Sequence, residues 1–276
     1  MTLSAVTPAE TAAPLAALLP ARRGAAWTVG YAPYDLRPNA ATSRLTNGRH
    51  ALFVVEQAGR IEVYADRPGL FPTTPDVVVD ATDPAPALTL ASRVLRSVLP
   101  DLDHDRIAET GRTKGWEKVL RDRAAELLEV GFALVDHGAH ATPVEGVNGP
   151  GITWTTTTGG TWGLWVYGQN RGMVLTYEGP VRGLYGFLPV AVTPYEGSAE
   201  DHAGSVFTRN LTDRLPQLRP VTASEVQFGA YREPSGWIAT PAADDPTDRA
   251  DDGQHVVAEI GGIGPDLLLS SVAYLV

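Results

Sequence analysis

The chain has 276 residues, a length that suits one large domain or two small ones and that can bury a substantial core. Its net charge of −10 and its pI near 5.0 disfavour nucleic-acid binding, because contacts to phosphates depend on clustered Lys and Arg. The absence of cysteine excludes disulfides, thiolate catalysis and cysteine-ligated metals.

The lack of disulfides also favours a cytoplasmic location for the protein. The first residues carry no basic segment, and Pro14 and Pro20 interrupt the apolar stretch, so we expect no signal peptide. No apolar run is long enough to span a bilayer. The sequence therefore predicts an acidic, cytoplasmic protein that does not engage membranes. Its preference for Arg over Lys is typical of a bacterial genome rich in G and C.

The first part of the chain predicts short elements with one clear hairpin, in which Ala58-Gly59 forms the turn. In chain order we expect a helix over 8–19, a strand over 26–32, a loop over 33–49, a hairpin of 52–57 with 60–65, and a strand over 76–80.

Two helices follow. The first begins at Asp83-Pro84 and ends at Pro100, and the second spans 114–135. Apolar spacing assigns a buried side to the second helix. The residues expected on that side are Trp116, Val119, Leu120, Leu127, Leu128 and Phe132.

Residues 137–151 read as a linker, because periodicity stops and Gly and Pro accumulate. Beyond it the chain becomes rich in strand patterns. We expect a hairpin of 161–168 with 173–179, a third strand over 182–192, a helix over 199–214, a hairpin of 225–232 with 236–241, a strand over 255–260, and a helix over 265–275.

These elements predict an α+β fold of antiparallel β-sheets with helices packed on one side. Both ends of the chain share the order hairpin, apolar strand, proline and helix. A duplication that produced two related β-β-β-α lobes would explain this order. The frequent occurrence of strand–turn–proline–helix segments in unrelated proteins would explain it equally well. We predict an N-terminal α+β lobe over 1–145 and a β-rich C-terminal lobe over 146–276.

Motifs for metals and cofactors are weak. The pattern at 101–105 resembles the start of a calcium loop, but Arg106 and Arg112 occupy the positions that need Gly and Glu. The His-x-x-His at 137–140 lies in a glycine-rich segment, and the acidic residues of 244–252 are typical of a solvated loop. The sequence predicts no metal site and no cofactor.

Aromatic residues gather between 154 and 195. In the strand over 161–168, Trp162 faces one way, and Trp165 and Tyr167 face the other. One face meets the core, and the other is covered by a helix or presents an aromatic surface for binding. The candidate ligand- or partner-binding residues are Trp162, Trp165, Tyr167, Arg171, Tyr177, Arg182 and Tyr185.

Two functional hypotheses follow. The first is a non-catalytic accessory protein, such as an adaptor, a chaperone or a protein of mobile elements or defence, that binds a protein or a small molecule through this aromatic β surface. The alternative is a metal- and thiol-independent small-molecule enzyme of a bacterial biosynthetic pathway. A homodimer is compatible with both hypotheses. Proton transfer or charge stabilisation would then come from His202, Glu178, Arg171 or Tyr177.

Overall fold

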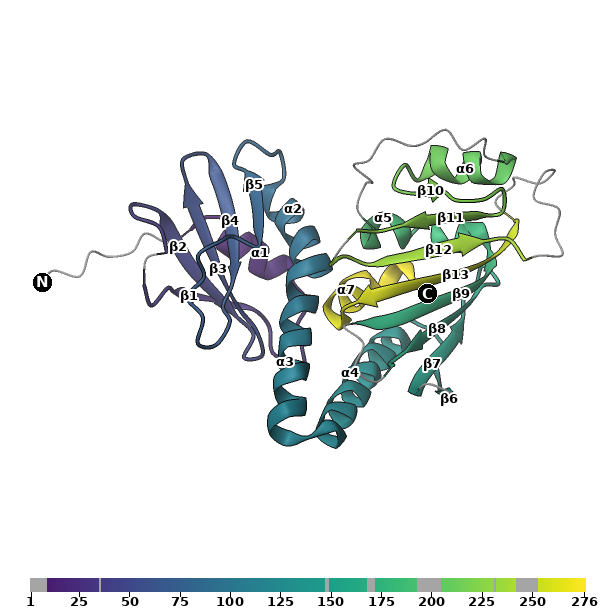
Figure 1. The fold of residues 1–276 in the computed structure, drawn as a ribbon, viewed down its shortest axis with the longest axis horizontal. Coiled ribbons are helices and arrows are strands. Elements are labelled where there is room, and N and C mark those ends of the chain that lie inside the picture. Colours follow the sequence, from purple (N-terminus) through teal and green to yellow (C-terminus); the bar gives the residue numbers. More distant parts are fainter. Residues whose placement is uncertain are drawn as a thin grey trace, which may run out of the picture. The chain divides into compact units, whose positions relative to one another are not determined.

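The computed structural model describes residues 9–34, 36–146, 149–167, 172–192, 205–230, 232–241 and 253–276. The chain forms two units, Met1–Leu102 and Asp103–Val276, which are described separately. Both contain an antiparallel sheet and helices, which confirms the predicted α+β class (Figure 1). The predicted lobe boundary near residue 145 lies inside the second unit and stays a prediction.

The first unit contains a five-stranded meander, in which each strand pairs with the next along the chain. The strands are β1 (Thr28–Tyr31), β2 (Ala41–Thr46), β3 (Ala51–Gln57), β4 (Arg60–Ala65) and β5 (Val77–Asp80). The β3–β4 hairpin is confirmed. Its turn residues Ala58 and Gly59 have φ of 50° and 80°, which suits a tight turn between twisted strands.

The predicted loop over 33–49 is wrong, because β2 lies inside it and pairs with both β1 and β3. This strand looks polar in sequence, yet Thr42, Ser43 and Leu45 are buried. The Ser43 hydroxyl gains a partner in the folded unit, where its Oγ accepts a hydrogen bond of 2.9 Å from the backbone N–H of Ala9. Pairing with β1 and β3, rather than the local sequence pattern, therefore determines that this segment forms a strand.

Helices of the first unit are α1 (Ala12–Leu18), α2 (Pro86–Arg93) and a π-helical turn η1 (Val94–Val98). The predicted stop at Pro100 is wrong, because α3 (Leu99–Lys114) follows directly. The π turn changes the hydrogen-bond register just before Pro100, and Pro100 lies in the first turn of α3, where a missing N–H is tolerated. The segment 101–105 is therefore helical.

The second unit contains an eight-stranded antiparallel sheet in the order β10-β11-β12-β13-β9-β8-β7-β6. The strands are β6 (Thr142–Gly146), β7 (Gly149–Thr155), β8 (Thr161–Trp165), β9 (Met173–Pro180), β10 (Arg219–Pro220), β11 (Glu225–Phe228), β12 (Ser235–Ala239) and β13 (His255–Ile263). The predicted linker over 137–151 is wrong, because it contains β6 and the start of β7. Each edge strand carries a proline, Pro143 or Pro220, which limits further strand pairing.

Helices of the second unit are α4 (Trp116–Asp136), η2 (Val181–Leu184), α5 (Leu188–Ala191), α6 (Val206–Arg214), α7 (Pro265–Ser271) and η3 (Val272–Tyr274). The predicted third strand over 182–192 is wrong, because η2 and α5 occupy it. Pro189 lies in the first turn of α5, a position that suits proline. In the described residues, no helix combines the length and apolar character needed to cross a membrane.

Both ends of the chain place three neighbouring antiparallel strands before a helix. These are β3, β4 and β5 before α2, and β11, β12 and β13 before α7. Proline lies in the first turn of both helices. The element order is shared, and the duplication itself stays a prediction.

One face of the eight-stranded sheet forms the core of the second unit. A row of paired residues crosses this face and is at most 3% exposed, and it comprises Trp154, Trp162, Tyr177, Ala258, Ile238 and Val226. The centroid of the Trp162 ring lies 4.5 Å from that of Tyr177 and 5.9 Å from that of Phe187, which lies next to α5. Trp154 Nε1 donates a hydrogen bond of 2.6 Å to the carbonyl of Leu275. Helices therefore cover this face (Figure 1).

The buried side of α4 differs from the prediction. Val119 and Leu127 are buried as expected, but Trp116, Leu120, Leu128 and Phe132 are exposed. The side that meets the unit also contains charged residues: its buried members are Val119, Arg123, Glu126, Leu127, Val130 and Leu134. Apolar spacing alone misassigned the face, because it takes no account of buried charges.

Buried charges join α3 to α4 and α4 to the sheet. Arg106 Nη2 donates a hydrogen bond of 2.8 Å to Glu126 and lies 3.6 Å from Asp103. Arg123 Nη2 donates a hydrogen bond of 2.8 Å to the carbonyl of Gly172, next to β9. Burial lowers the pKa of Arg123, while the carboxylates of Glu126 and Asp103 favour its charged form. These charged side chains therefore interact with one another inside the unit.

We predict that Arg106→Met destabilises the second unit by about 3–5 kcal/mol, because it leaves a buried carboxylate without its main counter-charge. The matched control is Arg112→Met, since Arg112 pairs with Glu109 at an exposed site. Exposed pairs contribute only about 0–1 kcal/mol. Urea unfolding followed by far-UV circular dichroism measures both changes. Equal effects of the two substitutions would contradict the assigned role of Arg106.

A second prediction concerns alkaline stability. Burial raises the pKa of Tyr177 to about 12, although the charge of Arg182 acts in the opposite direction. An unfolded tyrosine ionises near pH 10, so between about pH 10 and 12 the unfolded chain releases a proton that the folded unit keeps. The free energy of unfolding therefore falls as pH rises through this window. Tyr177→Phe reduces the fall, measured by urea titrations at several alkaline pH values; an unchanged pH dependence would contradict this cause.

Candidate binding surface

The second face of the eight-stranded sheet carries polar and aromatic side chains. The row beside the core row comprises Thr153, Gly163, Thr176, Glu259, Trp237 and Gln227. Apart from Gly163, these residues are exposed or half-buried. Period-two alternation puts Trp162 on the core face and Trp165 on this one. We call this second face, with Trp165 near its β6 edge, the open face.

The Trp165 indole packs against three glycines of the neighbouring strands and of its own strand. A methyl group added at Gly146, Gly151 or Gly163 would stand within 2.8 Å of the ring or overlap it. Trp165 Nε1 donates a hydrogen bond of 3.2 Å to Thr176 Oγ1, on the neighbouring strand. Glycine in a strand interior often marks close approach of another group, and here that group is the indole. The ring is therefore held in one position while remaining half-buried.

The charge of the open face is mainly acidic. Glu178, Glu225 and Glu259 point to this face from β9, β11 and β13. The Glu178 side chain is 68% exposed and lies 3.8 Å from His255. Burial raises the pKa of Tyr167, and the Glu259 carboxylate raises it further. A partner of this face meets aromatic rings, hydroxyl groups and negative charge.

The structure separates the residues predicted as a site. Trp165 and Tyr167 belong to the open-face side, whereas Trp162 and Tyr177 are 1% and 2% exposed in the core. Tyr177 donates a hydrogen bond of 2.6 Å to the Pro180 carbonyl. The remaining predicted residues lie after β9 or outside the described part of the chain.

Arg182 is exposed in η2, and Tyr185 follows this turn. The Arg214 guanidinium stands 4.8 Å from the centre of the Tyr185 ring, so α6 and η2 are linked by a cation–π contact. Arg171 lies outside the described residues. Tyr185 therefore already has a partner, whereas Arg182 is exposed.

Of the four residues suggested for proton transfer, the structure describes Tyr177 and Glu178, and these two do not lie together. Tyr177 and Glu178 are neighbours on β9, so they point to opposite faces of the sheet. His202 and Arg171 lie outside the described residues. The described part of the chain thus brings none of these groups together.

Sequence reasoning missed Trp237, Thr176 and Glu259 as members of the open face. Each lies in a strand that was predicted, but the order of the strands in the sheet was unknown. The pairing of β13 with both β12 and β9 places these residues in one row. In the sequence, the glycines at positions 146, 151 and 163 are the feature that could have indicated a large ring packed against these strands.

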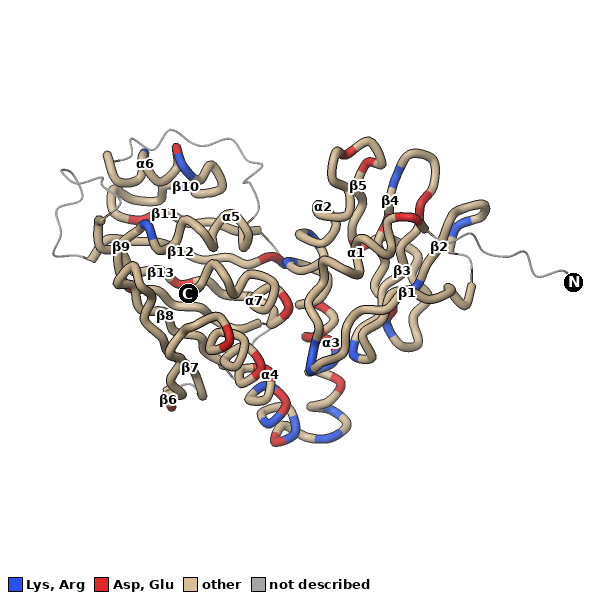
Figure 2. Tube along the Cα trace, turned by 180° about the vertical axis from the view of Figure 1, so that it is seen from behind, with Lys and Arg blue, Asp and Glu red and all other residues tan. Residues whose placement is uncertain are grey.

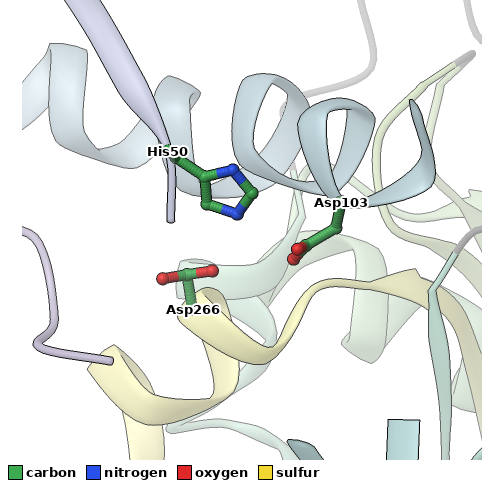
Figure 3. Close-up of side chains that lie close together, drawn as sticks. All are labelled: His50, Asp103 and Asp266. Atoms are coloured by element: carbon green, nitrogen blue, oxygen red, sulfur yellow. The ribbon is translucent and has the colours of Figure 1, made fainter. Parts of the chain in front are cut away.

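Two buried carboxylates also lie close together in the second unit. Asp103 on α3 and Asp266 in the first turn of α7 are 3% and 1% exposed, with carboxylate oxygens within 4.8 Å of each other (Figure 3). Arg106 provides positive charge next to Asp103. His50, the third residue drawn, belongs to the first unit, where its backbone N–H donates to Asn47. The carboxylate pair therefore extends the buried charges of α3 and α4.

A cavity of about 320 Å³ lies where α3 and α4 meet. Its lining residues are His104, Ile107, Ala108, Gly111, Arg112 and Trp116. The Trp116 ring packs closely against Gly111, where an added methyl group would stand 2.9 Å from the indole. The cavity thus adjoins the start of α4 and contains both apolar and basic side chains.

No family model, curated protein or solved structure matches the chain.

We predict that Gly151→Ala displaces the Trp165 indole, because the added methyl group overlaps the ring. The change should appear as a shifted ¹⁹F resonance of Trp165 in protein labelled with 5-fluorotryptophan, assigned with Trp165→Phe. The matched control is Gly30→Ala in β1, where the nearest atom is 3.9 Å from the added methyl group. An unshifted Trp165 signal in Gly151→Ala would show that close packing against the glycines does not position the ring.

Proposed function

We propose that this chain is a non-catalytic accessory protein of the bacterial cytoplasm that binds a protein partner through the open face of its second unit. The observation that carries the proposal is the half-buried Trp165 indole, which packs against three glycines and donates a hydrogen bond to Thr176. Rigid aromatic rings bury a large area at low entropic cost, which makes them frequent anchors of binding surfaces.

Charge on the open face supports a basic partner. Glu178, Glu225 and Glu259 give this face negative charge, and Arg219 stands at its far edge. The whole chain carries −10, which adds long-range attraction for a positively charged partner. Complementary charge mainly increases association rate and specificity, while the aromatic anchors supply affinity.

The hydroxyl and amide groups of the face suit a polar contact rim. Thr153, Thr176 and Gln227 lie in the same row as Trp237. Interfaces commonly combine aromatic anchors with such hydrogen-bonding groups at the edge. This arrangement supports the recognition of a folded protein surface or of an extended peptide laid across the strands.

The test is native mass spectrometry of the chain purified gently from its own host, with denaturing spectra for comparison. We expect the wild-type chain to retain a protein of defined mass, and Trp165→Ala to lose it while keeping a cooperative unfolding transition. Truncating an interface anchor typically costs about 2 kcal/mol or more, which corresponds to a loss of about thirtyfold in affinity.

Tyr31→Ala is the matched control, because Tyr31 is 85% exposed on the first unit. This variant should retain the partner as the wild-type chain does. A photo-crosslinking amino acid at Gln227 should capture the same partner, whereas one at Leu88 in α2 should not. Retention of the partner by Trp165→Ala would contradict the proposal. A retained small molecule in place of a protein would favour the alternative of a small-molecule enzyme.

A further inference from the structure

Glu259 lies on β13, one of the two central strands of the eight-stranded sheet, and is exposed on the open face. Because β13 pairs with β9 on one side and with β12 on the other, the residues directly opposite Glu259 are Thr176 and Trp237. Opposed side chains of an antiparallel pair have Cβ atoms about 4.5–5.5 Å apart. The Glu259 carboxylate therefore stands in solvent between a threonine and a half-buried tryptophan.

A second tryptophan approaches the same place from β8. Trp165 Nε1 donates a hydrogen bond of 3.2 Å to Thr176 Oγ1, and Thr176 is the β9 neighbour of Glu259. The Thr176 hydroxyl in turn donates a hydrogen bond of 3.3 Å to the carbonyl of Gly163. Thr176 thus holds the nitrogen edge of the Trp165 indole one strand away from Glu259, a spacing of about 4.8 Å.

A third aromatic residue lies within electrostatic range of this carboxylate. Burial raises the pKa of Tyr167, and the negative charge of Glu259 raises it further. The Tyr167 hydroxyl is therefore close enough to Glu259 to respond to its charge. Two indoles and a phenol thus border one carboxylate on the open face.

The other two carboxylates of the open face already have partners. Glu225 accepts a hydrogen bond of 3.0 Å from Gln227 Nε2, and the Glu178 carboxylate lies 3.8 Å from His255 Nε2. In the part of the chain that the structure describes, Glu259 has neither a hydrogen bond from its carboxylate to another side chain nor an ion pair. It is therefore the carboxylate of this face that is available to a partner.

Neutralising charge is also scarce around Glu259. Figure 2 shows that charged residues are dense along α3 and α4 and sparse on the strands of the sheet. Among the described residues of these strands, Arg219 is the one Lys or Arg, and it lies on the edge strand β10. The negative charge of Glu259 thus has no counter-charge within the sheet and attracts a cation from outside.

We propose that Glu259 is the binding site for an arginine side chain of the partner protein, whose guanidinium lies between the indoles of Trp165 and Trp237 and pairs with the Glu259 carboxylate. This proposal rests on the proposed function of the open face and names the chemical group that the face recognises.

The spacing of the two tryptophans suits a cation held by Glu259. The Trp165 indole ends at β9 and Trp237 projects from β12, so one ring borders β13 on each side. An aromatic ring attracts a cation within about 6 Å of its centroid, and one strand spacing is about 4.8 Å. A cation paired with Glu259 is therefore within reach of both rings.

Arginine fits this arrangement better than lysine. Its guanidinium is planar and weakly hydrated, so it stacks on aromatic rings while two of its N–H groups face a carboxylate. The lysine ammonium is compact and strongly hydrated, and one exposed carboxylate replaces little of its water. A neutral side chain would leave the charge of Glu259 without a counter-charge. The chemistry of the site therefore selects a guanidinium.

The first experiment uses a probe that does not depend on the identity of the partner. Nα-acetyl-arginine amide is titrated at low ionic strength into the full chain labelled with 5-fluorotryptophan, with Trp165→Phe and Trp237→Phe to assign the ¹⁹F resonances. We expect saturable shifts of both resonances with a dissociation constant in the millimolar range. The Trp116 resonance is the internal control and should not shift, because this residue is 43% exposed but lies on α4.

Substitutions test the role of the carboxylate. Glu259→Gln keeps the shape of the side chain, removes its charge and should weaken binding of the arginine probe about tenfold. The matched control is Glu225→Gln, on the same face, whose carboxylate already accepts from Gln227. This control should bind the probe as the wild-type chain does. Far-UV circular dichroism confirms that both variants remain folded.

Two further probes test the chemical class of the ligand. Nα-acetyl-lysine amide should bind more weakly than the arginine probe. The citrulline analogue, which keeps the shape of arginine without its charge, should shift neither resonance. An equal response to either probe would overturn the assignment of a guanidinium site, as would unchanged Trp165 and Trp237 resonances or equal binding by Glu259→Gln.

The second experiment repeats native mass spectrometry from the host with the same variants. Glu259→Gln should retain less of the partner protein than the wild-type chain, and Glu225→Gln should retain as much. A partner lost by Trp165→Ala but fully retained by Glu259→Gln would overturn the arginine site and leave the open face as the binding surface. Absence of any retained protein would contradict the proposed function, and the titration with the arginine probe would then decide the site by itself.

Discussion

The period-two alternation of the eight-stranded sheet is the constraint on which the second unit depends. Each strand sends neighbouring residues to opposite faces, and in the part of the chain that the structure describes helices pack against one of them. Trp162 therefore belongs to the core, while Trp165, three residues later, belongs to the open face. Because the eight strands are paired in a defined register, a slip by one residue would exchange the two faces. The core and the candidate binding surface are thus two consequences of the same register.

Buried charge on α4 determines what that helix leaves exposed. Arg123 and Glu126 occupy positions on the side that meets the rest of the unit, with Arg106 and the Gly172 carbonyl as partners. A buried ion pair contributes little net stability compared with apolar packing, but removing one member costs much. The apolar residues at 116, 120, 128 and 132 are therefore left exposed.

The open face depends on residues far apart in sequence, since β8, β9, β12 and β13 each contribute to one row. Because this surface is built on a sheet, many paired strands hold its side chains in place.

Local patterns allowed several elements to be predicted. The β3–β4 hairpin follows from alternation around Ala58-Gly59, and α7 follows from Pro265 at the start of an apolar helix pattern. The prediction for 182–192 failed, because a short apolar run does not distinguish a strand from buried helical turns. The prediction for 33–49 failed, because β2 is stabilised by two neighbouring strands rather than by its own pattern.

The sequence by itself determined the acidic charge, the absence of cysteine chemistry, the α+β class and the opposite directions of Trp162 and Trp165. These properties depend on composition or on backbone geometry within one strand. Only the tertiary structure decided which face of the sheet is covered, which residues share a row with Trp165, and which side of α4 is buried. The physical reason is that these properties depend on pairing between distant segments and on buried charges finding partners, and neither leaves a local pattern in the sequence.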